Sequence, residues 1–141
     1  MSLKPIRTYF KTRLTETDSN FKEHKNGFSD RDDLPNSLFN KSFFISVNSV
    51  NNNEHAGNFV KDEISVRIDI FFKGYRDVQL SLENAFDLVN TFRLKSVNPK
   101  NNTDLIKFVD CSGIDVEHLP NNDNDIILTL NFSVTAMFAV A

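Results

Sequence analysis

The sequence predicts one α+β domain with the element order α-β-β-α-β-β, a mainly antiparallel four-stranded sheet, and helices packed on one face of that sheet. Two stretches, residues 64–72 and 126–138, alternate between apolar and polar side chains, which is typical of strands with one buried face. Two others, residues 5–14 and 78–95, carry apolar residues at helical spacing. The chain has 141 residues, the size of one domain, so we expect residues 1–141 to form a single unit.

The composition limits the classes of partner. The net charge is −3 and the isoelectric point is about 5.6. A general binder of nucleic acids or anionic membranes relies on clustered Lys and Arg, so the acidic balance argues against specific nucleic-acid binding. The chain has 14 Phe and no Trp. A Phe ring has no hydrogen-bonding atom, so we expect most of these rings in the core or at an interface.

Cysteine usage and hydropathy indicate a cytoplasm-like compartment. Cys111 is the single cysteine and cannot form an intrachain disulfide. The first residues lack the apolar core of a signal peptide. No window approaches the roughly 18 apolar residues that a membrane-spanning helix needs, so we expect no membrane partner.

The first helix is predicted to begin at Pro5, because proline suits the first helical turn. Its apolar face is Ile6, Tyr9, Phe10 and Leu14, and it should end near Ser19. Residues 15–28 are polar, and the charge run at residues 30–33 is interpreted as a solvated loop, with a metal site as the alternative.

A first strand is predicted at residues 42–48, followed by a long polar loop insertion at about residues 49–62. Long loops without secondary structure are uncommon in compact domains. We therefore expect residues 51–58 to project from the body and contact a partner, with Asn52, Asn53 and His55 as interface candidates.

The stretch at residues 64–77 is predicted to be a central strand that leads into a turn and a helix. Gly74 permits the turn, and Asp77 is expected to cap the helix. One side of the strand is apolar, with Ile64, Val66, Ile68, Ile70 and Phe72. The helix, running to about Lys95, should bury Val78, Leu82, Ala85, Phe86, Val89 and Phe92.

The C-terminal part is predicted to be a hairpin. Residues 105–119 form a strand interrupted by a bulge at Ser112 and Gly113, and residues 121–125 form the turn. The last strand should pair with residues 64–72 and point seven residues inward: Ile126, Leu128, Leu130, Phe132, Val134, Ala136 and Phe138. On the opposite face, Phe71, Ile127 and Met137 are expected to be exposed apolar groups available to a partner.

No pattern of residues indicates catalysis or a cofactor. His24, His55 and His118 fall in separate predicted elements, and no metal-ligand spacing joins them. Cys111 is interpreted as a small packed residue rather than a nucleophile. The acidic residues near Asp123 lack the glycine and glutamate of a calcium loop. We therefore expect no enzyme, no metal and no cofactor.

Three segments together resemble a known family. They are the N-terminal helix with Pro5-Ile6-Arg7, Tyr9-Phe10 and Arg13-Leu14, the strand end Phe72-Lys73-Gly74-Tyr75-Arg76-Asp77, and the closing segment from Asp123 to Phe132. This combination is similar to the tail terminator and tail-completion proteins of tailed bacteriophages, which include minor tail and tail-to-head joining proteins. The resemblance spans most of the chain and is weakest over residues 15–62.

The resemblance implies a structural virion-assembly protein of the tail or neck, assembled in the cytoplasm of a bacterial host. Its partners would be copies of itself in a ring, expected to be hexameric, together with the tail tube protein and the head–tail connector. The ring would end tube growth and offer a docking surface to the connector, and DNA would pass through its centre. Lys73, Tyr75 and Arg76 are the interface candidates on the matched segment, with ordinary surface residues as the alternative. Two other functions stay open, a head-completion connector of the neck and a non-viral binding module.

Overall fold

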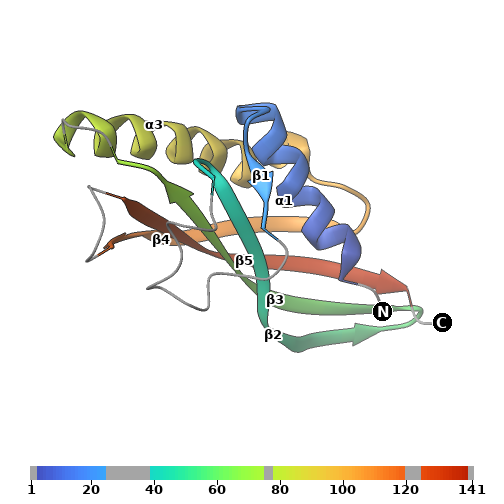
Figure 1. Ribbon diagram of the computed structural model, residues 1–141. Coiled ribbons are helices and arrows are strands. Elements are labelled where there is room, and N and C mark those ends of the chain that lie inside the picture. The colour runs from blue at the N-terminus through green and yellow to red at the C-terminus, as the bar shows by residue number, and fades with distance from the viewer. Residues whose placement is uncertain (1–2, 25–38, 75–77, 120–124, 140–141) are drawn as a thin grey trace.

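The computed structural model describes residues 3–24, 39–74, 78–119 and 125–139. The elements in chain order are α1 (Lys4–Thr17), β1 (Lys22–Glu23), β2 (Ser42–Ala56), β3 (Phe59–Phe72), α3 (Val78–Val97), the short 3-10 helix η1 (Pro99–Asn101), β4 (Ile106–His118) and β5 (Ile126–Ala139). Figure 1 shows α1 and α3 side by side on the same face of the sheet. The predicted α+β class and the placement of the helices are therefore confirmed.

Within the described residues, the sheet has five strands in the order β1-β2-β3-β5-β4. All neighbouring strands are antiparallel except β1, which pairs in parallel with β2 through Lys22 and Glu23. The prediction of four strands was wrong in this detail, because a two-residue strand is too short to show an alternating pattern. The predicted pairing of the two most regular strands, β3 and β5, is confirmed along their whole length.

The core lies between the helices and the sheet face that they cover, which we call the inner face. All seven residues of β5 that were expected to point inward are buried. The ring of Phe10 on α1 lies 4.7 Å from the ring of Phe132 on β5, measured between centroids. The Tyr9 hydroxyl donates a hydrogen bond to the carbonyl of Ser96, which joins α1 to α3. No helix in the described part of the chain is long and apolar enough to span a bilayer.

The predicted loop at residues 49–62 is instead the end of a long hairpin. Strand β2 continues to Ala56, and β3 begins at Phe59, which pairs with Ala56. Gly57 has a φ of +58°, the left-handed value that a two-residue hairpin turn requires. Asn51 and Asn52 of β2 carry little hydrophobic signal, but they pair with Glu63 and Asp62 of β3, because strand pairing uses backbone groups that every residue has.

Two predictions about exposure were also wrong. Phe71 and Ile127, expected in solvent, are fully buried in a second cluster with Leu119 on the opposite side of the sheet from α1 and α3. Phe86, expected in the core, is 41% exposed. The bulge in β4 is confirmed by the register shift between Cys111 and Gly113. The expected cap Asp77, the charge run at residues 30–33 and most of the turn at residues 121–125 lie outside the described residues.

Candidate functional site

The sheet face turned away from α1 and α3, which we call the outer face, carries the candidate site. Register fixes which residues share this face. Ser49, Ser65, Ser133 and Asp110 lie opposite one another across β2, β3, β5 and β4. The neighbouring row across β3 and β5 contains Arg67 and Asn131. Side chains in a strand alternate between faces, so the apolar residues between these positions point to the core.

A buried charge holds the middle of the outer face together. The Asp69 side chain is almost entirely shielded from solvent. The Thr129 hydroxyl donates a hydrogen bond of 2.6 Å to Asp69 Oδ1, and Arg67 Nε donates one of 3.2 Å to the same oxygen. The negative charge is therefore compensated by a cation and by a hydroxyl on the neighbouring strand, as a buried carboxylate requires.

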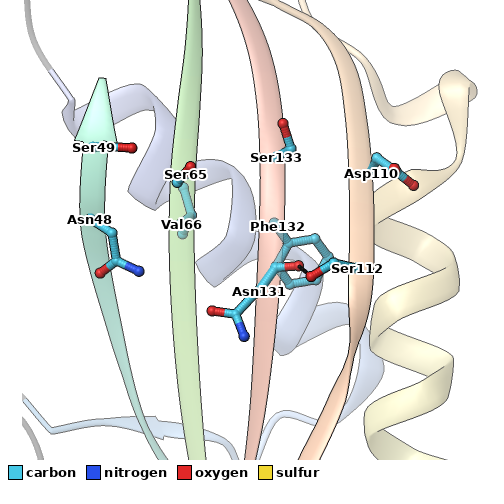
Figure 2. A pocket seen from close by; sticks show the side chains of 9 residues that line it. All are labelled: Asn48, Ser49, Ser65, Val66, Asp110, Ser112, Asn131, Phe132 and Ser133. Atoms are coloured by element: carbon cyan, nitrogen blue, oxygen red, sulfur yellow. Dashed lines mark hydrogen bonds between the residues drawn. The ribbon is translucent and has the colours of Figure 1, made fainter. Parts of the chain in front are cut away.

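Next to this network, the outer face is hollowed over about 390 Å³. Figure 2 shows the hollow from the outer side, with the helices behind the sheet. Its lining comes from four strands and combines hydroxyls, amides and one carboxylate with the apolar side chains of Val66 and Phe132. The Ser112 hydroxyl donates to the carbonyl of Asn131, while Ser133 donates to Glu63 Oε1 at the border of the hollow. Such a surface can exchange hydrogen bonds with a polar partner, while Val66 and Phe132 add apolar area to its floor.

One end of the outer face is apolar, and we call its three residues the ridge: Phe59, Met137 and Phe108. Phe59 pairs with Ala139, two residues beyond Met137, and Phe108 pairs with Thr135, two residues before it. Diagonal neighbours of this kind lie about 7–8 Å apart. Phe59 is 47% exposed and Phe108 is 58% exposed. The ridge is therefore a diagonal line of apolar side chains across β3, β5 and β4, in which Phe59 and Phe108 are exposed and Met137 between them is partly buried.

A second exposed apolar surface lies between α3 and β4 on the inner side of the sheet. This groove has a volume of about 400 Å³ and is lined by Leu82, Glu83, Phe86, Asp87 and Val116. Val116 and Phe86 are each 41% exposed. Val116 lies on β4, the edge strand, and is paired with the core residue Leu128. Its side chain therefore points to the inner face of the sheet, which the helices cover. The groove therefore lies at the rim of the core, where α3 leaves β4 partly uncovered.

The ridge and the groove are far apart. Val116 pairs with Leu128, which is nine residues before Met137 on β5. At about 3.3 Å per strand residue, this separation is about 30 Å. Figure 1 shows the β2–β3 hairpin and the start of α3 at opposite ends of the sheet. The two surfaces thus occupy opposite ends and opposite faces of the domain.

The interface candidates from the sequence do not form one patch. Asn52 and His55 are exposed near the tip of the β2–β3 hairpin, and the Asn52 amide donates to the carboxylate of Asp62. Asn53 belongs to β2 at a register shift. Lys73 is exposed beyond the other end of β3, where its backbone N–H donates to Asn40 Oδ1. His55 pairs with Val60, so about 13 residues of β3, or about 40 Å, separate the two groups.

Tyr75 and Arg76 lie outside the described residues. The ridge could not be predicted from the sequence, because its position depends on the register of the strands. The sequence-based prediction also placed Phe86, which lines the groove, in the core. One signal for the hairpin was available, since Gly57-Asn58 between two extended stretches is a two-residue turn pair.

No three potential ligands among His, Cys, Asp and Glu converge as a metal cluster in the parts of the chain that the structure describes. The calcium-like segment contributes only Asp125 to the described residues. Its carboxylate accepts a hydrogen bond from the backbone N–H of Gly74, and its carbonyl accepts one from the backbone N–H of Leu119.

Comparison of the chain with family models and with curated proteins finds no match to either.

Proposed function

We propose that this chain is a structural subunit that assembles head to tail into a ring, and that the ring acts as a tail terminator of a tailed bacteriophage. The observation that carries the first part is the presence of two unlike apolar surfaces, the ridge and the groove, on opposite ends and faces of one domain. A ring needs a heterologous contact, in which one patch meets a different patch on the neighbour. Exposed apolar groups gathered at two sites favour such a contact.

The second part of the proposal rests on the resemblance of the sequence segments to terminator and tail-completion proteins. In this proposal the ring, expected to be a hexamer, binds the last ring of tube protein and then the head–tail connector. Lys73, Tyr75 and Arg76 remain interface candidates on the matched segment. The ring would belong to the tail or neck of the virion.

Charge on the outer face fits a passage for DNA better than a DNA-binding surface. Among the described solvent-accessible residues of this face, carboxylates outnumber cations, with Glu63, Asp110, Asp115 and Glu117 against Lys61 and Arg67. Such a face repels phosphate groups instead of holding them. If it lines the ring, DNA would pass without binding.

Growth of tail tubes tests the function. Purified chain would be added to assembling tube protein from the same virion, and tube lengths would be measured by negative-stain electron microscopy. A terminator should stop elongation and leave a ring at one end of each tube. Tubes that grow unchanged in the presence of preformed rings would contradict the terminator role and favour the head-completion role. The double variant Tyr75→Ala/Arg76→Ala should fold normally but weaken this assembly.

A binding module is the second candidate, and the hollow on the outer face favours it. Its hydrogen-bonding lining suits a small polar molecule or a polar peptide segment. A chain that remains a clean monomer at high concentration in light scattering would favour this function over assembly.

A further inference from the structure

We infer that the ridge of one copy packs into the groove of the next copy, so that Phe59 and Phe108 meet Phe86 and Val116 across the subunit interface. This inference rests on the proposed ring assembly and specifies the contact that builds it. The groove is large enough to accept an aromatic ring, and aromatic anchors in pockets usually supply most of the binding energy at an interface.

Two lysines flank the ridge, among charges of both signs that include Glu63 and Asp110 on the same face, whereas carboxylates border the groove. Lys61 lies two residues after Phe59 on the same face of β3, and Lys107 is the exposed residue next to Phe108. The groove is bordered by the exposed carboxylates of Glu83 and Asp87. Packing the ridge into the groove therefore brings two ammonium groups towards two carboxylates.

The carboxylates of the groove disfavour symmetric pairing through that surface. A groove-to-groove dimer would bring Glu83 and Asp87 of both copies together. Like charges brought together at an interface oppose association. Glu63 lies beside the ridge on the same face, towards the middle of the sheet. Its carboxylate accepts a hydrogen bond from the Ser133 hydroxyl. The lysines beside Phe59 and Phe108, together with the carboxylates of the groove, thus favour a second copy in the head-to-tail orientation.

Two variants, each with one damaged surface, test the contact. Phe59→Ser/Phe108→Ser removes the ridge, and Phe86→Ser/Val116→Ser removes the groove. All four side chains are exposed, so folding measured by circular dichroism should persist. Each variant alone should be monomeric, because losing an anchor of this kind weakens binding about 30-fold or more. Leu94→Ser, about two helical turns beyond Asp87 on α3 and outside the groove lining, is the matched control and should keep the ring.

Mixing the two variants in equal amounts gives the decisive result. One intact ridge and one intact groove remain, so the mixture should form a heterodimer and nothing larger, as measured by multi-angle light scattering. Dimers formed by either variant alone would indicate a symmetric contact and overturn the inference.

Charge reversal provides a second test that does not depend on removing apolar groups. Glu83→Lys/Asp87→Lys should abolish the ring, and adding Lys61→Glu/Lys107→Glu should restore it. Rings that survive the reversal and both apolar variants would contradict this contact while leaving the proposed function standing. A wild-type chain that never forms rings, alone or on tubes, would instead contradict the proposed function itself.

Discussion

The hydroxyl of Thr129 on β5 donates a hydrogen bond of 2.6 Å to the buried carboxylate of Asp69 on β3. The two residues lie directly opposite each other on the outer face, in the middle of the sheet. Arg67, two residues before Asp69, supplies the compensating positive charge. A charged network is therefore part of the strand pairing that positions the hollow and the ridge.

Replacing the hydroxyl should destabilise the domain. Thr129→Val keeps the shape of the side chain and leaves the Asp69 carboxylate with one hydrogen bond fewer in a buried place. Hydrogen bonds to charged groups contribute about 1.5–3 kcal/mol, and we expect a loss in the free energy of unfolding within this range, measured in urea. Thr135→Val, on the same strand and face but less buried, should cost under about 0.5 kcal/mol. Equal effects of the two substitutions would show that the bond to Asp69 contributes nothing.

Burial of Ile127 on the outer face predicts a large cost for truncation. The side chain is fully buried in the cluster with Phe71 and Leu119. Ile127→Ala should lower the free energy of unfolding by about 2–5 kcal/mol, because it removes buried methyl groups and leaves a cavity. Leu94→Ala, at a position 55% exposed on α3, is the control and should cost less than about 1 kcal/mol. A small effect at Ile127 would mean that this end of the outer face is open to water in solution.

Ile127 and Met137 show how far the sequence alone could predict which residues are buried. Alternation of β-branched and polar residues was enough to identify β3 and β5, and helical spacing was enough for α1. Alternation states only that Ile127 and Met137 share a face. Whether water reaches them depends on Leu119, which comes from another part of the chain and covers only one end of that face.

The ridge was hidden for a related reason. Its three residues are separated in the sequence and meet only through the register of three strands. A register shift in β4 between Ile106 and Phe108 sets the position of Phe108 on the outer face. A one-residue change in register moves a side chain to the other face, so sequence alone could not place it.

Acid should weaken the contacts between α1, β1 and β2. A hydrogen bond from Lys41 holds the pKa of Asp18 below its usual value. Burial tends to raise the pKa of Glu23, but hydrogen bonds from Arg7 and Lys11 outweigh it and the pKa is lowered. Carboxyl groups with a lowered pKa in the folded state stabilise it above their unfolded pKa of about 4, and this contribution is lost as the pH falls through the folded value.

Stability should therefore fall as the pH is taken from about 5 to 3, as measured by urea midpoints. The double variant Asp18→Asn/Glu23→Gln should be less stable near pH 7 and should show a flatter dependence over this interval. Raising the salt concentration to about 1 M should reduce the difference between the two proteins, because these ion pairs are partly exposed. The same slope in both proteins would show that other groups cause the acid sensitivity.

Cys111 should react slowly with alkylating reagents. Its side chain is partly buried on β4, and burial raises the pKa of the thiol. Because only the thiolate attacks, a raised pKa reduces the reactive fraction at neutral pH. We expect iodoacetamide to modify the folded protein at pH 7.5 at least about tenfold more slowly than the same chain in urea, followed by mass spectrometry, and a small cysteine peptide gives the reference rate for a free thiol of pKa about 8.5. A folded-state rate above that of the peptide would contradict the packed role of Cys111 and indicate an activated thiol.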